Sequence, residues 1–331
     1  VAGYPDLRKA IIAKLKHENG LDYDMSDIVV STGAKQAIAN AVLCLVNPGE
    51  EVIIPTPYWV SYSEVVKLAE GKSVFIESTV EQNFKITPQQ LEAAITPNSK
   101  LFMFSSPCNP TGSVYSKAEL EGLARVFEKH PHVYILSDEI YEHINFIGGH
   151  ESIAQFPAIK DRVIIINGFS KGYAMTGWRI GYTASTKELA SAFDKLQGQI
   201  TSGTCSITQR AGTAAYEGGL ETVIAMRDEF KKRRDIVYNL LKDIDGLTVN
   251  LPEGAFYFFP NVTSFFGKSY NGRTIKDSDD LSLFLLEEGH VATVGGDSFG
   301  DPKSIRLSYA AAEDKLIEAC RRIKEALGKL V

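Results

Sequence analysis

Short apolar runs rich in β-branched residues recur through the first two thirds of the chain, and amphipathic helical patterns separate them. Runs that are apolar on both faces are typical of strands buried inside a parallel sheet. The pattern therefore predicts an α/β domain in which helices cover both faces of a mostly parallel sheet. The predicted strands are IVVS (28–31), EVII (51–54), LFMFS (101–105), VYILS (133–137), VIIIN (163–167) and RIGY (179–182).

Helix-start signals agree with this alternation. Thr87 and Ser116 each precede a helical pattern, and Gln90 and Glu119 follow them at the spacing of a capping box. A helix is also expected from Pro5 to Glu18, directly at the start of the chain. Because a helix begins so abruptly there, we expect that a natural N-terminal segment is absent.

The pattern changes after about Leu220. A long helical stripe is followed by the strand-like runs LTVN, AFYFF and SIRLSY, with helices expected at about 280–288 and 313–328. We therefore predict a large domain over residues 1–230 and a smaller α+β domain over residues 231–331. The long helix could run from one domain into the next.

Composition limits the possible partners. The chain has 35 basic and 41 acidic side chains, and its net charge of -6 argues against a nucleic-acid or anionic-membrane surface. Four cysteines, scattered without a CxxC pair, indicate neither a disulfide scaffold nor a zinc site and favour a reducing compartment. No apolar segment approaches the roughly 18 to 20 residues that span a bilayer, and no signal peptide is evident. We expect a cytoplasmic protein.

Ligands of parallel α/β sheets bind outside the carboxyl ends of the strands. The first such position carries Thr32-Gly33-Ala34-Lys35, small residues that open a helix. Free N–H groups and the positive end of a helix dipole suit a phosphate there, although a plain helix start that needs Gly33 for its turn explains the same residues. Neither GxGxxG nor GxxxxGK[ST] occurs, so the usual dinucleotide and P-loop sites are not predicted.

Three further strand ends carry an aromatic ring, an amide and a carboxylate. Trp59 is either a core residue or a flat face for a planar ring. Asn109 lies in the turn Pro107-Cys108-Asn109-Pro110, which is either a simple tight turn or a rigid holder for the amide. Asp138, with Tyr141 three residues later, ends a buried strand. A carboxylate there is costly unless it caps a helix or meets a cation or donors.

The strand VIIIN is followed by Ser170 and Lys171, and Arg179 comes after a glycine-containing turn. A single lysine is usually a solvated surface residue. A lysine beside other cations in a dry pocket can instead have its pKa lowered enough to act as nucleophile and base, as Schiff-base chemistry requires. Together with a carboxylate, an aromatic face and a phosphate-binding helix start, this lysine predicts a pyridoxal-phosphate site.

Seven motifs span nearly the whole chain: STGAKQAI, PTPYWVSY, SSPCNPTGSVYSK, LSDEIYEHI, NGFSKGYAMTGWRIGY, GAFYFFP and IRLSYA. With these motifs the sequence resembles a fold-type I pyridoxal-phosphate enzyme, specifically a class I aminotransferase of the bacterial aspartate aminotransferase group. SDEIY followed by SKxxxMTGWRxGY is the most specific part of the match. The resemblance implies pyridoxal 5'-phosphate as cofactor, a transaminase of amino-acid metabolism and biosynthesis, and a homodimer with shared active sites.

The resemblance assigns roles around the cofactor ring. Lys171 would form the Schiff base, and Asp138 would pair with the ring nitrogen. Asn109 and Tyr141 would contact the phenolic oxygen, and Trp59 would stack on the ring. Trp59 and Asn109 would also contact the substrate.

The resemblance likewise assigns the anion-binding groups. Ser170 and Arg179 would hold the phosphate together with the backbone of Gly33, Ala34 and Lys35. Arg306 would bind the α-carboxylate of the substrate as a bidentate pair, for which lysine is a poor substitute.

The sequence departs from the family pattern in three ways. Many relatives have a serine three residues before the lysine, whereas this chain has Gly168, so the phosphate would rely on other donors. A preceding family segment that carries a substrate-contacting glycine and a tyrosine reaching the partner subunit is expected to be missing, which bears on activity. The additional cation that aspartate-selective members use for the distal carboxylate is not identified.

The expected reaction moves an amino group between an L-amino acid, most simply aspartate or glutamate, and a 2-oxo acid through a Lys171 Schiff base. The same scaffold also suits an aminotransferase for aromatic or other amino acids, or a carbon–sulfur β-lyase. A non-catalytic ligand-binding module is disfavoured because all the catalytic residue types are present. A nucleotide-binding protein is disfavoured because its phosphate motif is missing.

Overall fold

One seven-stranded sheet organises the large domain. The computed structural model describes residues 1–331. The strands lie in the order β1-β7-β6-β5-β4-β2-β3, and all run in one direction except β7, which is antiparallel to both of its neighbours. The prediction of a mostly parallel sheet is confirmed. The strands are β1 (Ile28–Ser31), β2 (Glu51–Thr56), β3 (Lys72–Glu77), β4 (Ser99–Ser105), β5 (Tyr134–Asp138), β6 (Val163–Gly168) and β7 (Gly181–Ala184).

Two strands differ from the sequence prediction. The run RIGY predicts a strand from residue 179, but β7 begins only at Gly181 because Arg179 has a left-handed backbone with φ 54°. The strand β3 is not predicted at all. It is an edge strand with exposed positions at Lys72 and Glu77, so it lacks the continuous apolar pattern of the buried strands.

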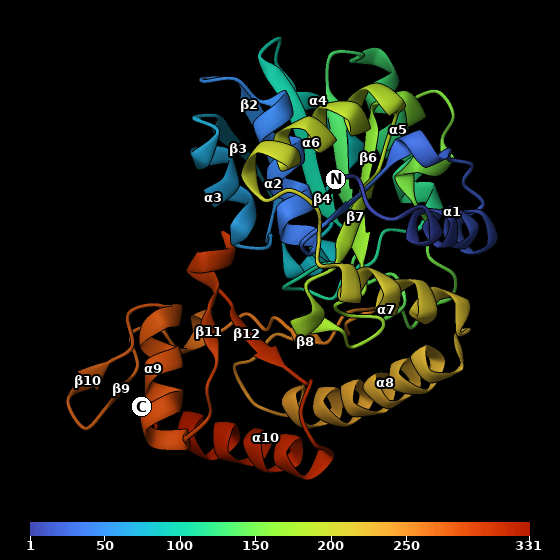
Figure 1. Ribbon diagram of the computed structural model, residues 1–331. Helices are drawn as coiled ribbons and strands as arrows, with labels where there is room; N and C mark the ends of the chain where they lie inside the picture. Colours follow the sequence, from blue (N-terminus) through green and yellow to red (C-terminus); the bar gives the residue numbers. More distant parts are fainter.

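Helices cover both faces of this sheet (Figure 1). Successive residues of β6 alternate between two hydrophobic cores, with Ile165 in the core that contains Leu7 and Ile164 in the core that contains Ile38. The first core includes side chains of α1, α4 and α5, and the second includes side chains of α2, α3 and α6. The helices of this part of the chain are α1 (Pro5–Asn19), α2 (Ala34–Leu45), α3 (Ser61–Leu68), α4 (Pro88–Ala94), α5 (Lys117–Lys129), α6 (Lys187–Ile200) and α7 (Ser206–Glu217). The helix that follows, α8 (Glu221–Leu241), packs against the small domain rather than on this sheet (Figure 1).

The two predicted capping boxes are present. The Thr87 side chain accepts a hydrogen bond from the N–H of Gln90 (3.2 Å) at the start of α4. The Ser116 side chain accepts from the N–H of Glu119 (3.4 Å) at the start of α5. These bonds satisfy N–H groups that have no partner within the helix, which is why the chain begins a helix at these residues.

The small domain is built on a three-stranded antiparallel sheet in the order β11-β12-β8. Its core includes Val237 and Leu241 from the second half of α8, together with Phe258. The run LTVN contributes only a single bridge, between Thr248 and Asn261, rather than the expected strand. The elements of the small domain are β8 (Tyr257–Phe258), β9 (Ser269–Tyr270), β10 (Arg273–Thr274), α9 (Ser278–Gly289), β11 (Val294–Gly295), β12 (Ile305–Ser308) and α10 (Glu313–Leu327).

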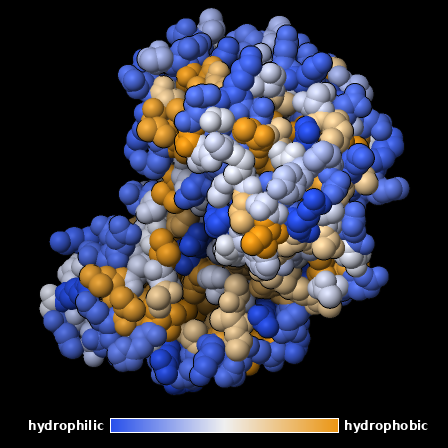
Figure 2. All heavy atoms as spheres, in the orientation of Figure 1, coloured by the Kyte–Doolittle hydropathy of each residue, from blue (hydrophilic) through white to orange (hydrophobic).

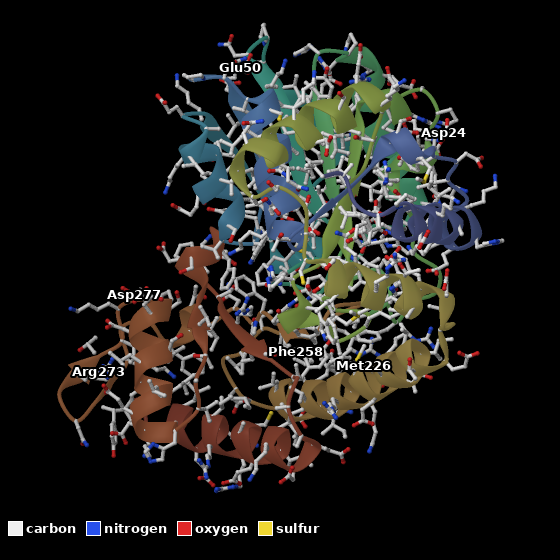
Figure 3. The ribbon with its side chains drawn as sticks, in the orientation of Figure 1. Asp24, Glu50, Met226, Phe258, Arg273 and Asp277 are labelled. Carbon is white, nitrogen blue, oxygen red and sulfur yellow. The ribbon has the colours of Figure 1, made fainter.

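The two domains meet at a notch in the outline of the molecule (Figure 2). Figure 3 shows exposed acidic side chains at the periphery of each domain, such as Asp24 on the large domain and Asp277 on the small one, whereas Phe258 lies inside. None of the helices combines the length and the apolar composition needed to span a membrane.

Candidate active site

A cavity of about 320 Å³ lies between the carboxyl ends of β4 and β5 and the small domain. Ten of the eleven predicted site residues line it, and Gly33 adjoins it through Arg179. Sequence reasoning missed five lining residues, although all five stand inside quoted motifs: Tyr62, Ser105, Ile140, Thr176 and Tyr257. The lining residues are Ala34, Lys35, Trp59, Tyr62, Ser105, Asn109, Asp138, Ile140, Tyr141, Ser170, Lys171, Thr176, Arg179, Tyr257 and Arg306.

Lys171 follows β6 and projects its amine into the cavity. Its Nζ lies 5.6 Å from the centre of the Tyr141 ring and 5.4 Å from that of Phe256. Burial lowers the pKa of Lys171, and the nearby charges of Arg306 and Arg179 lower it further, although the charge of Asp138 opposes them. The lowered pKa makes the neutral amine, the form that acts as nucleophile and base, easier to reach than for a solvated lysine.

Asp138 ends β5 and is buried. Its Oδ2 accepts a hydrogen bond from the hydroxyl of Tyr62 (2.8 Å), and its Oδ1 accepts from the N–H of Ile140 (3.2 Å). Burial raises the pKa of Asp138 to about 6, against these two donors, and the adjacent charge of Glu139 adds to the rise. The carboxylate therefore gains from any cationic partner that enters the cavity.

Asn109 and Arg306 meet across the cavity although 197 positions separate them. Arg306 Nη1 donates to Asn109 Oδ1 at 3.0 Å. The peptide bond that joins Asn109 to Pro110 is cis, as are those before Pro57 and Pro107. No carboxylate of the chain pairs with Arg306, so its remaining donors can bind an anion.

Tyr141 also meets a residue that the sequence analysis left out. Its hydroxyl lies 3.0 Å from the hydroxyl of Tyr257, which projects from β8 of the small domain. Burial raises the pKa of both phenols, so both stay protonated near neutral pH. Because one of these hydroxyls donates to the other, one O–H of the pair remains free to donate to a ligand.

The part of the cavity next to the start of α2 carries features that suit an anion, and it is called the phosphate end below. Gly33 precedes α2 with φ 84°, and a Cβ there would lie 2.3 Å from Arg179 Nη2, so only glycine lets the arginine approach. Arg179 Nη1 donates to the carbonyl of Thr176 (3.0 Å), and no carboxylate of the chain neutralises its charge. Ser170 and Thr176 line the same space, and the Thr176 hydroxyl donates to the carbonyl of Ser170 (3.0 Å). A helix start, a guanidinium and the hydroxyl of Ser170 match the donor set of a phosphate site.

Gly168 lies away from this cavity. It pairs with Gly181 across β6 and β7, and a Cβ at Gly168 would lie 2.8 Å from the Gly181 Cα and 2.8 Å from the Ile180 carbonyl oxygen. A serine there would collide with backbone. Thr176, which the sequence analysis did not assign, lines the cavity, and its hydroxyl donates to the carbonyl of Ser170 (3.0 Å).

A buried ion pair supports the loop that carries Tyr141. Glu142 pairs with the ammonium of Lys14 from α1 and accepts from Asn167 Nδ2 (2.7 Å) at the end of β6. Asn167 Oδ1 in turn accepts the N–H of Gly168 (2.7 Å). The charge of Lys14, with that of His143, lowers the pKa of Glu142 below its usual range despite burial. The ends of β5 and β6 are therefore tied together behind the cavity.

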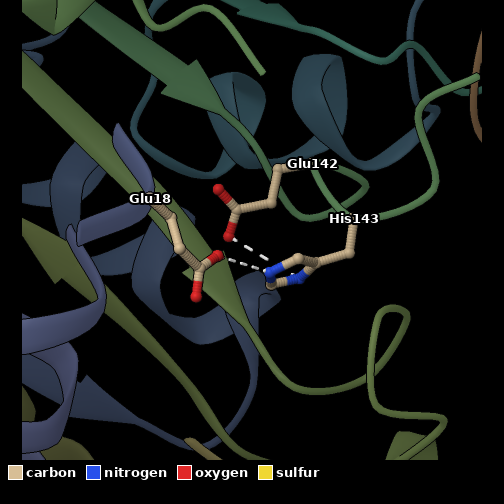
Figure 4. A group of neighbouring side chains, drawn as sticks. All are labelled: Glu18, Glu142 and His143. Carbon is tan, nitrogen blue, oxygen red and sulfur yellow. Dashed lines mark hydrogen bonds and ion pairs between the residues drawn. The ribbon is translucent and has the colours of Figure 1, made fainter. Parts of the chain in front are cut away.

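His143 extends this support toward the surface (Figure 4). Its Nε2 lies 2.8 Å from Glu18 Oε2, and its Nδ1 lies 3.8 Å from Glu142 Oε1. A Cβ at Gly172, directly after Lys171, would lie 2.7 Å from His143 Nδ1. The imidazole therefore packs against the turn that holds the cavity lysine.

The cavity fits pyridoxal phosphate on the chemistry of its donors. An amine with a lowered pKa, a buried carboxylate that lacks a cation, an aromatic side chain and an anion-binding helix start match the aldehyde, pyridine nitrogen, ring and phosphate of that cofactor. The α/β fold and this cavity define a fold-type I pyridoxal-phosphate enzyme.

Comparison with known proteins narrows the class. Residues 1–323 match the family described as aminotransferase class I and II. The aspartate/prephenate aminotransferase of Cereibacter sphaeroides is 47% identical over 327 residues, which cover 98% of this chain and 82% of the relative. The crystal structure of the aspartate aminotransferase from Rhizobium meliloti superposes with a TM-score of 0.97 at 45% identity, over 100% of this chain and 83% of that one.

More distant structures have the same fold. An aromatic aminotransferase from Pyrococcus horikoshii gives a TM-score of 0.92 at 36% identity, over 99% of this chain and 86% of that one. The chain belongs to the class I and II aminotransferase family. Its reaction is the transfer of an amino group between an amino acid and a 2-oxo acid, with pyridoxal 5'-phosphate as the cofactor.

Proposed function

We propose that Lys171 performs the proton transfers of this reaction. Pyridoxal phosphate, when bound, supplies an aldehyde that condenses with amines and a ring that takes up the electron pair of the amino-acid Cα. Burial lowers the pKa of the Lys171 amine in the cavity, so it can remove the Cα proton and return it as general base and acid. Asp138 would hold a proton on the pyridine nitrogen, because a buried carboxylate without a cation stabilises that charge.

The other residues would hold and orient the reactants. Arg306, beside Asn109, would bind the α-carboxylate with its free donors. Tyr141 and Asn109 would contact the phenolic oxygen of the ring, and Trp59 would stack on the ring. The phosphate would be held by Ser170 and Arg179 and by the backbone of Gly33, Ala34 and Lys35.

Replacing Lys171 tests this assignment. We expect Lys171→Ala to lower the transfer rate by about 100-fold to 10,000-fold, the usual range for loss of a positioned general base. The cofactor should still bind, because Arg179, Ser170 and the start of α2 remain. Lys187→Ala, on the surface at the start of α6, is the control and should keep wild-type turnover. Substantial turnover by Lys171→Ala protein would reject the role.

An unpaired cation in the cavity, Lys35, favours an acidic substrate. Its side chain lines the cavity, its Nζ lies 4.9 Å from the centre of the Trp59 ring, and no carboxylate of the chain pairs with it. It is therefore a candidate for the distal carboxylate of aspartate or glutamate, a cation that the sequence alone did not identify. Relatives at 43–47% identity that are named for aspartate, and several also for prephenate, point the same way.

The substrate class can be read from the loss of the yellow absorbance when single amino acids are added to the holoenzyme. Aspartate and glutamate should react fastest, and prephenate and 2-oxoglutarate should restore the absorbance. Lys35→Ala should raise KM for aspartate roughly tenfold to a hundredfold, since a hydrogen bond between charged groups contributes about 1.5–3 kcal/mol. KM for alanine should stay unchanged. Equal effects on both amino acids would reject the role of Lys35.

The same assay separates the alternatives. A faster reaction with phenylalanine or tyrosine would assign the chain to aromatic substrates, as in the Pyrococcus horikoshii relative. Release of pyruvate and ammonia from a cysteine conjugate would indicate a carbon–sulfur β-lyase. No response to any amino acid would favour a ligand-binding module.

We also propose a homodimer. Large apolar side chains are exposed beside the phosphate end of the cavity, with Trp178 47%, Ile200 56% and Ile207 72% exposed. The segment that carries Ile200 and Ile207 contacts the start of α2, where Gln36 donates to Thr201 (2.6 Å). A second copy on this face would bury these residues next to the site.

We propose a cytoplasmic location, because the four cysteines are unpaired.

A further inference from the structure

The guanidinium of Arg306 lies close to two aromatic rings. Its Cζ is 4.6 Å from the ring centre of Tyr257 and 4.7 Å from that of Phe299. Tyr257 lines the cavity, whereas Phe299 does not and is 2% exposed. A guanidinium within about 6 Å of a ring centre is attracted by the electron-rich face. Phe299 therefore contacts the carboxylate-binding group without being placed to touch the substrate.

Arg306 needs such contacts to hold one orientation. Its guanidinium donates a hydrogen bond to Asn109, and no carboxylate of the chain pairs with it to fix its orientation. A long side chain with one hydrogen bond retains several rotamers, and ordering it on binding costs affinity. Aromatic contacts restrict the guanidinium before the substrate arrives, without occupying its donors.

Phe299 is itself held by the large domain. Its carbonyl accepts the N–H of Tyr58 (3.0 Å), the residue before the cavity residue Trp59. Gly300, with φ 76°, lets the loop approach so closely that a Cβ there would lie 2.6 Å from Tyr58 Cε1. The ring also packs edge-on against Phe259 at 5.8 Å. Its position is thus set by both domains at once.

We propose that Phe299 is a positioning residue for Arg306. Its ring holds the guanidinium beside Asn109 in the orientation that binds the substrate carboxylate, and the bond to Tyr58 ties that orientation to the large domain. The inference rests on the proposed role of Arg306. If Phe299 were only a core residue, any apolar side chain of similar volume would serve equally well.

Affinity for a carboxylate ligand that cannot react tests the proposal. Maleate is titrated into the holoenzyme for the wild type, Phe299→Leu and Phe299→Tyr. Loss of the ring in Phe299→Leu should raise the Kd of maleate about threefold to thirtyfold, and Phe299→Tyr, which keeps the ring, should stay within about twofold. The reaction of the holoenzyme with ethylamine, which has no carboxylate, and the affinity for pyridoxal phosphate should not change.

A double-mutant cycle separates positioning from a general effect on the fold. In an Arg306→Gln background, Phe299→Leu should cause no further loss of maleate affinity, because the two residues act through one contact. Unchanged maleate affinity in Phe299→Leu, or additive losses in the cycle, would overturn the inference. If Arg306→Gln itself left maleate affinity intact, the proposed role of Arg306 would fail first. If it weakened binding while Phe299→Leu did not, only the inference would fail.

Discussion

Asp138 has a carboxylate buried among donors that do not neutralise it. Tyr62 and the N–H of Ile140 stabilise the charge in part, and burial still raises its pKa. The sequence predicted Asp138 as the partner of a cation because a carboxylate at the end of a buried strand is costly. It could not predict Tyr62, because the position of a hydroxyl three residues after Trp59 depends on how α3 packs on the sheet.

This raised pKa gives the cofactor-free protein a defined pH dependence. Burial raises the pKa of Asp138 from 3.8 to about 6, so between these values the folded state binds a proton that the unfolded chain releases. Stability conferred by that proton is therefore lost as pH rises through the window. Asp138→Asn cannot titrate, so its free energy of unfolding at pH 7 should exceed that of the wild type by up to about 3 kcal/mol. This difference in stability should vanish near pH 4.

Urea unfolding of both cofactor-free proteins across this pH range measures the difference. With pyridoxal phosphate bound the order should reverse, because the carboxylate then has a cationic partner. A difference that is constant with pH would show that Asp138 is not the titrating group.

At the scale of elements, the sequence predicts the strands that carry the site. It does not predict how closely neighbouring strands approach each other. The apolar runs identified six of the seven strands of the large sheet, since burial on both faces leaves a clear pattern. The close pairing of Gly168 with Gly181 leaves no such pattern. In the sequence, this pairing is visible only because Gly168 stands where many relatives have a serine. The cause of that difference is the close approach of the backbones of β6 and β7.

The crowding at Gly168 predicts that serine is not tolerated there. Gly168→Ser would place a Cβ 2.8 Å from backbone atoms of Ile180 and Gly181, which cannot move independently of the sheet. We expect a loss of about 1–3 kcal/mol in the free energy of unfolding, the usual cost of overpacking. Gly149→Ser is the control, because nothing lies within 4 Å of a Cβ there. Equal stability of both variants in urea would contradict the crowding.

The ion pair between α1 and the loop after β5 gives a second prediction at this scale. Lys14→Met keeps the length of the side chain but leaves the carboxylate of Glu142 buried without its cation. Loss of one partner of a buried pair typically costs about 3–5 kcal/mol. Lys16→Met on the same helix removes a solvent-exposed partner of Asp22, so it should change stability little. Similar urea midpoints for the two variants would show that the buried pair contributes no more than the exposed one.

At the scale of the whole molecule, the cavity exists only because two distant parts of the chain meet. The sequence placed Asn109 and Arg306 in one site through family resemblance, since no local pattern links positions 197 residues apart. Tyr257 and Phe299 were missed for the same reason. The domain boundary at residues 230 and 231 stays a prediction, and it falls within the continuous helix α8 (Glu221–Leu241).

Association of two copies is the remaining prediction at this scale. The purified protein should sediment at roughly 73 kDa, twice the 36.4 kDa of one chain, because burial of the exposed apolar face beside the cavity favours a dimer. Ile207→Asp places a charge at a residue that is 72% exposed in the single chain. It should leave the fold intact, raise the dissociation constant of the dimer at least about tenfold and lower activity at low protein concentration. Leu68→Asp, at an equally apolar residue that is 68% exposed on α3, should leave association unchanged. A wild-type protein that sediments as a fully active single chain at every concentration would reject the dimer.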